Sequence, residues 1–221
     1  MNGSLRVPKP DEIRCDACAD TFNKAGVKKV LEFGSGPGWN LLPFKNNGYE
    51  VAGVELSRGL VEVGQQHGMN VKQGSFDEIE GVYDAIICNH VVEHFTDFIG
   101  QMQQLLSHLR PEGFFYGAVP DKKLFGIGQM QNAHVYNFTQ PTFHHYMQKC
   151  GLKFLEGGPA QEIHQYGLFQ KTEVDRFEDL SGEYSRMSKT IKKVKRREFA
   201  GKFIDSIGVG NGLRKLRSKV L

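Results

Sequence analysis

Short apolar runs alternate with amphipathic stretches along most of this chain. Runs rich in apolar and β-branched residues predict strands at 27–33, 50–55, 69–73, 83–89 and 113–119. Apolar residues at helical spacing predict helices at 10–25, 38–48, 57–67 and 96–109. This alternation is typical of a parallel sheet covered by helices on both faces, which is a doubly wound α/β fold.

The pattern changes after the fifth predicted strand. Residues 121–133 are rich in Gly, Gln and Lys without a sustained period, and we expect a loop over the mouth of the sheet. A helix follows at 139–150, with Thr139 as its N-cap and Gly151 as its C-terminal stop. Two further strands are expected at 152–157 and 163–170, which brings the sheet to seven strands.

A glycine-rich loop follows the first predicted strand. Glu32 lies near the end of that strand, and Gly34, Gly36 and Gly38 come after it at every second position. Glycines at this spacing permit positive φ and leave no side chain between the backbone and a ligand. We expect Glu32 to face the crevice so formed, which would suit a nucleotide-like ligand with a ribose and a positive centre. The dinucleotide fingerprint needs a third glycine where Trp39 stands, so the pattern does not favour NAD.

A second acid occupies the end of the second predicted strand. Glu55 lies 21 positions after Gly34, close to the ~20-residue spacing at which such an acid reaches a ribose hydroxyl. A carboxylate accepts two hydrogen bonds side by side, which suits a vicinal diol. The alternative is a solvated glutamate at a strand end. Together with the glycine loop, the spacing favours the ribose role.

Three later segments, together with the glycine loop, carry a family resemblance. Segment 83–95 contains Asp84 and ends in Glu93-His94-Phe95, segment 109–120 contains an L-x-P-x-G turn, and 134–139 reads H-x-x-x-F-T. In this order, over about residues 27–170, they resemble the class I S-adenosylmethionine (SAM)-dependent methyltransferases that act on small molecules. Glu112 departs from the pattern, because it replaces the first glycine of the family's turn.

The resemblance implies a Rossmann-like, mostly parallel sheet of seven strands whose last strand is antiparallel and inserted between its neighbours. It also implies SAM as the cofactor. Ser75 stands where the family often has an acid at the adenine end, with Asp77 as a shifted alternative. The residues expected to bind the cofactor are Glu32, Phe33, Gly34, Ser35, Gly36, Gly38, Trp39, Glu55, Leu56, Ser75, Phe76, Asn89 and His90.

Histidines after the fourth strand are the candidates for catalysis. Methyl transfer is an in-line displacement, and an oxygen acceptor must lose its proton to a general base. His90 directly follows the strand and is the first candidate. His94 could act there too, or the Glu93-His94 pair could fasten the loop. His134 is expected to line the acceptor pocket, although a packing role remains open for each of these histidines.

The residues after the fourth strand also restrict the acceptor. Asn89-His90-Val91-Val92 is neither the [DN]-P-P-[YF] motif used on exocyclic amines nor a Pro-Cys pair of cytosine methyltransferases. We therefore expect a small-molecule or carrier-linked acceptor, with a hydroxyl oxygen favoured. Two alternatives stay open, an RNA methyltransferase and a SAM-binding protein without catalysis.

The charge is distributed unevenly along the chain. Residues 1–188 carry 17 Lys and Arg against 23 Asp and Glu, whereas 189–221 carry 11 against 2. We expect 1–188 to form one domain with a helical lead at 1–26, and 189–221 to be a basic, partly helical extension. That extension could pack on the domain or contact an anionic membrane, and nucleic acid is the less favoured partner. The sequence does not predict the oligomeric state.

Cysteine usage and the start of the chain bear on location and metals. Four cysteines do not make a disulfide framework in 221 residues, and 1–10 has no apolar signal region, so we expect a cytoplasmic protein. Cys15 and Cys18 form a C-x-x-C pair, but no second pair lies nearby to complete a zinc site. No metal site is predicted, although Glu93 and the nearby histidines leave a metal requirement open.

Overall fold

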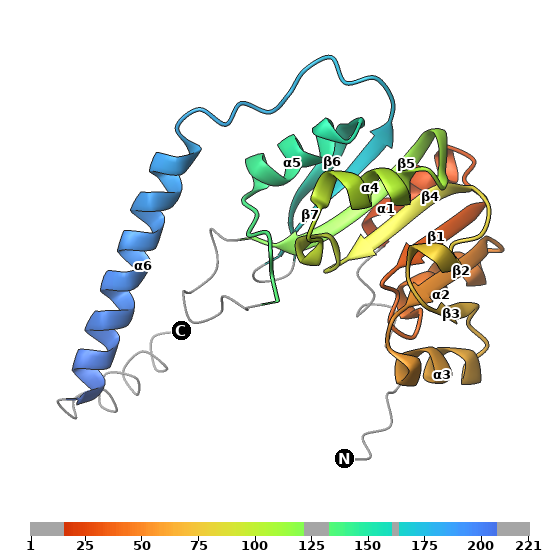
Figure 1. The fold of residues 1–221 in the computed structure, drawn as a ribbon, viewed down its shortest axis with the longest axis horizontal. Helices are drawn as coiled ribbons and strands as arrows, with labels where there is room; N and C mark the ends of the chain where they lie inside the picture. The colour runs from red at the N-terminus through yellow and green to blue at the C-terminus, as the bar shows by residue number, and fades with distance from the viewer. Residues whose placement is uncertain (1–15, 122–132, 161–163, 207–221) are drawn as a thin grey trace.

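The computed structural model describes residues 16–121, 133–160 and 164–206, and one seven-stranded sheet forms its centre (Figure 1). The strands lie in the order β3-β2-β1-β4-β5-β7-β6. β7 is antiparallel to β5 and β6 and lies between them, whereas β1 to β5 pair in parallel. The strands are β1 Lys29–Phe33, β2 Glu50–Glu55, β3 Val71–Gln73, β4 Tyr83–Asn89, β5 Leu109–Pro120, β6 Leu152–Ala160 and β7 His164–Lys171. The predicted Rossmann-like fold, with its inserted antiparallel last strand, is confirmed.

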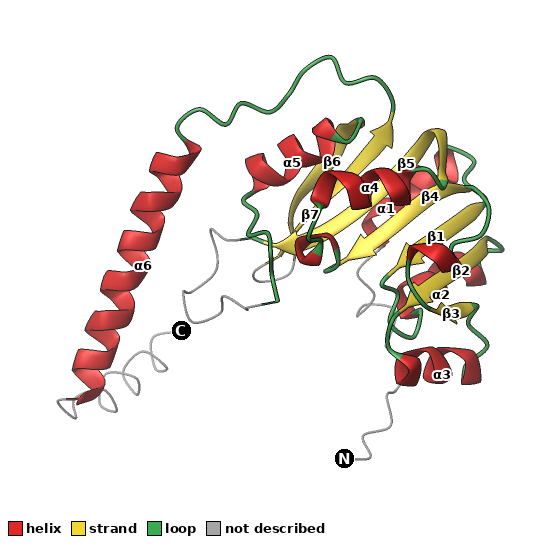
Figure 2. Cartoon of the chain, in the orientation of Figure 1, coloured by secondary structure: helices red, strands yellow, loops and turns green. Residues whose placement is uncertain are grey.

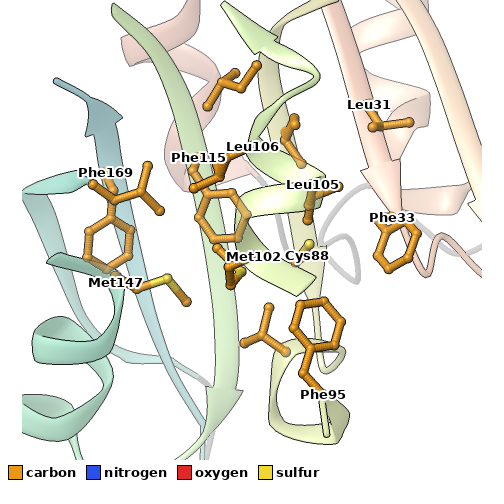
Figure 3. Packing of buried hydrophobic residues seen from close by; sticks show 14 of the residues in the cluster. Leu31, Phe33, Cys88, Phe95, Met102, Leu105, Leu106, Phe115, Met147 and Phe169 are labelled. Atoms are coloured by element: carbon orange, nitrogen blue, oxygen red, sulfur yellow. The ribbon is translucent and has the colours of Figure 1, made fainter. Parts of the chain in front are cut away.

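Helices cover both faces of the sheet (Figure 2). The helices are α1 Asp16–Lys24, α2 Leu42–Asn46, α3 Arg58–Gln66, α4 Phe98–Leu106, α5 Gln140–Lys149 and α6 Glu183–Ser206. One buried apolar cluster joins α4 and α5 to the sheet, and Figure 3 shows Met102 and Met147 packed with Phe115 and Phe169. A second cluster joins α1, α2 and α3 to the other face. Successive residues of a strand point to opposite faces of the sheet, so Leu31 belongs to the first cluster and Val30 to the second.

Two elements differ from their predicted bounds for identifiable reasons. The helix expected at 38–48 is a 3₁₀ turn, Trp39–Leu41, followed by the short α2, because Gly38 is left-handed (φ 83) and Pro43 restarts the helix at its first turn. β5 begins at Leu109, four positions before the predicted start, since Leu109 pairs with Tyr83 ahead of a register shift in the β4–β5 ladder. Glu112, near the start of β5, has φ 57, a backbone that favours glycine.

The helix predicted after strand five is confirmed at both ends. Thr139 precedes α5 in an extended conformation, and its N–H donates to the hydroxyl of Thr142 at 2.8 Å. Gly151 follows α5 with φ 81, as expected of a C-terminal stop. Most of the predicted loop at 121–133, together with Cys15 and residues 207–221, lies outside the described residues.

α6 extends away from the sheet and is joined to the domain at its first turn (Figure 1). The hydroxyl of Thr139 donates to Oε1 of the buried Glu183 at 2.5 Å. The predicted boundary between 188 and 189 falls inside this helix, and the division into domains stays a prediction. In the part of the chain that the structure describes, no helix combines the length and apolar character needed to cross a membrane.

Candidate active site

The glycine loop takes the backbone conformation that its sequence predicts. Gly34, Gly36 and Gly38 have φ of 71, 54 and 83°, which other residues adopt only with strain. A Cβ on Gly34 would lie 2.4 Å from Cγ2 of Val91, so the loop and the segment after β4 approach as closely as glycine allows. The N–H groups of Gly34 and Ser35 both donate to the carbonyl of Val54, at 2.8 and 3.1 Å. These bonds hold the loop against the end of β2.

Glu55, at the end of β2, holds the same loop through its side chain. Its Oε2 accepts from the N–H of Gly36 at 2.9 Å, and its Oε1 accepts from the N–H of Ser57 at 2.8 Å. Each carboxylate oxygen has a second lone pair, so the side chain can still accept bonds from a diol. The acid is therefore fixed in position before any ligand binds.

A pocket of about 390 Å³ opens beside this loop, at the carboxyl ends of β1, β2 and β4. Parallel α/β sheets bind ligands at such edges. The predicted site residues that line it are Phe33, Gly34, Glu55, Leu56, Ser75, Phe76, His90 and His94. Val54, Gly74, Val91, Phe95 and Gln101 also line it and were not among the predicted residues.

An aromatic wall accounts for part of what sequence reasoning missed. Phe33 and Phe76 stack with ring centroids 4.6 Å apart, and Phe95 lies 5.9 Å from Phe76. Phe95 reads as an ordinary core residue, and it does belong to the buried cluster that Figure 3 shows. Only its position after the Glu93-His94 pair could have placed it in the site.

Glu32 is fully buried and is not among the residues that line the pocket. Its Oε1 accepts from Nδ2 of Asn40 at 2.7 Å and from Nδ2 of Asn89 at 3.2 Å. Burial raises the pKa of Glu32 from 4.5 to about 7, and the two amide donors oppose that rise. Glu32 thus joins the segment after the glycine loop to the end of β4.

The other predicted cofactor residues that do not line the pocket lie directly around the loop. The side chain of Ser35 is buried, and its hydroxyl donates to the carbonyl of Gly36 at 3.3 Å. Trp39 packs edge-on against His67, with ring centroids 5.1 Å apart. Gly36, Gly38 and Asn89 complete this set, and their role in cofactor binding stays a prediction.

His90 lies at the junction of the glycine loop, β4 and the pocket. Its φ is 56°, an uncommon conformation for a residue with a side chain, and its N–H donates to the carbonyl of Ala118 at 2.9 Å. Nδ1 of His90 lies 3.4 Å from Oε1 of Glu93. Its Nε2 is buried and has no hydrogen-bond partner among the described residues. A histidine with one nitrogen beside a carboxylate and the other unpaired can accept a proton from a bound ligand.

His94 and His134 meet although 40 positions separate them in the sequence. Their rings are 4.8 Å apart between centroids. The chain returns to this place because the N–H of Tyr136 donates to the carbonyl of Glu93 at 3.0 Å. His94 lines the pocket, and His134 is not among its lining residues.

Comparisons with known proteins agree with this architecture. A family model described as "Methyltransferase domain" matches residues 11–156. A ubiquinone biosynthesis O-methyltransferase of Rickettsia akari is 24% identical over 149 residues, which are 61% of this chain and 56% of that protein. A second, from Rickettsia prowazekii, is 26% identical over 100 residues, 42% of this chain and 40% of that one. The chain thus matches about half the length of these curated relatives.

Two solved structures share the fold. A 1,6-didemethyltoxoflavin-N1-methyltransferase of Burkholderia thailandensis, solved with its substrate and S-adenosylhomocysteine, is 20% identical with a TM-score of 0.58, covering 74% of this chain and 80% of that chain. A magnesium protoporphyrin IX methyltransferase of Synechocystis PCC 6803, solved with SAM, is 16% identical with a TM-score of 0.56, covering 71% and 77%.

Proposed function

The chain belongs to the methyltransferase domain family, and from this premise we propose that it transfers a methyl group from SAM to a hydroxyl oxygen of a small-molecule or carrier-linked acceptor. One observation carries the proposal: the glycine loop, Glu55 and His90 all border the same pocket. The relatives that are named O-methyltransferases favour oxygen as the acceptor atom.

The donor side of the pocket suits a nucleoside. Glu55 offers its remaining lone pairs to a ribose diol, and the glycine loop has no side chains that would keep a ligand from its backbone. Phe33, Phe76 and Phe95 give the neighbouring wall an apolar, aromatic character that suits an adenine ring. Ser75 lies in the same lining and offers a hydroxyl.

The acceptor side supplies the base. For this role we assign the proton of the neutral imidazole to Nδ1, the nitrogen nearer Glu93, so that Nε2 carries the lone pair. The acceptor O–H gives its proton to Nε2 while the oxygen bonds to the methyl carbon. Bound SAM would supply the methyl group, and S-adenosylhomocysteine would leave with the electron pair of the methyl–sulfur bond on its sulfur. Glu93 stabilises the imidazolium that forms.

Titration calorimetry of the full chain with SAM and with NAD tests the donor. We expect SAM to bind and NAD not to bind; binding of NAD in place of SAM would contradict the proposal. Formation of S-adenosylhomocysteine with matched phenol and aniline acceptors then tests the acceptor atom. Turnover of the amine alone would overturn the choice of oxygen.

We also infer that α6 contacts an anionic membrane surface. Tyr184, Ile191 and Phe199 on this helix are 86, 41 and 75% exposed, which is unusual for apolar side chains of this size. Exposed lysines lie among them, including Lys192 and Lys193. Helices that carry lysines beside exposed aromatic and aliphatic side chains are found at anionic lipid interfaces. The test is sedimentation with vesicles that contain phosphatidylserine, where Phe199→Ser should lower the bound fraction; equal binding to neutral vesicles would contradict the inference.

A further inference from the structure

Glu93 has an environment that the proposed reaction does not fully explain. Its side chain is 1% exposed, and neither carboxylate oxygen has a hydrogen-bond partner among the described residues. His90 approaches one oxygen, at 3.4 Å, which is longer than a good hydrogen bond. A buried carboxylate is costly unless it is paired or coordinates a metal. A positively charged partner would therefore stabilise the buried Glu93 carboxylate.

Two histidines present ring nitrogens to the same place. A carboxylate oxygen of Glu93 and one ring nitrogen each of His94 and His134 all lie within 4.8 Å of one another. A tetrahedral zinc ion with bonds of about 2.0–2.1 Å holds its ligand atoms about 3.4 Å apart. Closing the cluster onto an ion therefore requires side-chain movements of about an ångström.

The backbone around the cluster orients one of its ligands. Nδ1 of His94 lies 2.9 Å from the carbonyl oxygen of Ala133, which assigns the proton to Nδ1 and leaves the lone pair on Nε2. Histidine ligands of metals in general donate their other N–H to such a carbonyl. The bond from Tyr136 to the carbonyl of Glu93 brings His134 to the same point. The cluster is thus assembled by contacts outside its own side chains.

We propose that Glu93, His94 and His134 bind one divalent transition-metal ion, for which Zn²⁺ is the expected species, at the acceptor side of the pocket. Three protein ligands leave a coordination position open, as at catalytic zinc sites. His94 lines the pocket, so a ligand in the pocket can reach that position. Two imidazoles and one carboxylate favour zinc over Mg²⁺, which prefers oxygen ligands.

The role of the ion rests on the proposed function, although its binding does not. An acceptor hydroxyl that occupies the open position would have its pKa lowered, because a bound cation stabilises the oxyanion. The proton still passes to His90, and the oxygen still attacks the methyl carbon. The ion would thus assist deprotonation without changing the atoms that are exchanged.

The first test is metal binding by the full chain after treatment with EDTA. We expect calorimetry to show one equivalent of Zn²⁺ bound, and Co²⁺ to give the visible absorption of a low-coordinate nitrogen–oxygen site. In Glu93→Gln and His134→Asn the affinity for Zn²⁺ should fall at least about 100-fold, since loss of even an outer-sphere partner costs 10- to 100-fold. His108→Asn is the matched control, because His108 bonds to the carbonyl of Gly81 and does not line the pocket.

Two further measurements separate this site from other sources of zinc binding and from the proposed function. Cys15→Ser removes the other sequence motif that could take zinc, and binding lost in this variant but kept in His134→Asn would overturn the proposal. Absence of Zn²⁺ binding in the unmodified chain would overturn it as well. SAM binding, measured in the same samples without metal, reports separately on the proposed function. A chain that binds SAM and no zinc refutes the metal site alone.

Discussion

The two sides of the pocket satisfy their polar groups in opposite ways. On the donor side, both carboxylate oxygens of Glu55 accept backbone N–H groups, and the N–H groups of Gly34 and Ser35 share the carbonyl of Val54. On the acceptor side, Nε2 of His90 and both oxygens of Glu93 are buried without a hydrogen-bond partner among the described residues. The Glu55 carboxylate on the donor side is thus held by backbone N–H groups, whereas the His90 and Glu93 atoms on the acceptor side have no such partner among the described residues.

This difference matches two different tasks. A cofactor that is the same in every turnover binds best to a rigid, preformed surface. A site that must hold an acceptor and accept its proton needs polar atoms that are still free to bond. The strained backbone of His90, with φ 56, belongs to the second kind of surface.

The largest expected effect comes from removing the base on the acceptor side. Asn tolerates a left-handed backbone, so His90→Asn should keep the conformation while losing the proton acceptor. We expect kcat to fall about 100- to 10,000-fold with the affinity for SAM little changed. His108→Asn should leave both kcat and the affinity for SAM unchanged. Turnover is measured as S-adenosylhomocysteine formation at saturating substrates, and unchanged turnover would remove His90 from the base role.

The second prediction concerns the pH dependence of stability that the buried Glu32 causes. Its folded-state pKa of about 7 lies above its ordinary value of 4.5, so its neutral form stabilises the protein fully below pH 4.5. That contribution is lost as the pH rises to about 7, a change of about 3 kcal/mol. Glu32→Gln should remove this loss, so that the variant gains stability over the unmodified protein as the pH increases.

Urea unfolding at pH 5 and pH 8 measures this change in the free energy of unfolding. Glu62→Gln is the matched control, because Glu62 is exposed and pairs with Arg58 one helical turn away. The same pH dependence in the Glu32→Gln protein and in the unmodified one would show that Glu32 does not cause it.

The smallest of the three effects concerns the donor side. Glu55→Gln keeps the shape of the side chain but removes the charge that holds the N–H of Gly36 and would accept the ribose hydroxyls. A hydrogen bond to a charged group contributes about 1.5–3 kcal/mol, so SAM affinity should fall about 10- to 100-fold. Turnover at saturating SAM should change little. A fall in kcat with unchanged SAM affinity would reverse the proposed division of the pocket.

Local sequence signals predicted the fold and the backbone conformation of the glycine loop well. The parallel sheet follows from the βα alternation, and the inserted antiparallel last strand follows from the family resemblance. The glycine loop has the positive φ values that its spacing indicates. Thr139 and Gly151 mark the ends of α5 because their preferences depend only on neighbouring backbone. Pro43 and Gly38, by contrast, shorten a helix whose apolar spacing predicts a longer one.

The acceptor side could be predicted only in part, because it depends on contacts between distant segments. His90 and His94 are adjacent to the fourth strand in the sequence and do line the pocket. His134 meets His94 because the chain comes back to the 3₁₀ turn at Val92–His94, and no local sequence pattern predicts that return. The burial of Glu32 depends likewise on Asn40 and Asn89, which lie on different segments.

The left-handed backbone at residue 90 limits how this protein could change its chemistry. Few residues other than glycine adopt such a φ readily, and Asn, Asp and His are the ones enriched there. Of these, only Asp and His can take up a proton. An enzyme redesigned for a new acceptor would therefore have two choices of base at this position, imidazole or carboxylate, unless the end of β4 itself were rebuilt.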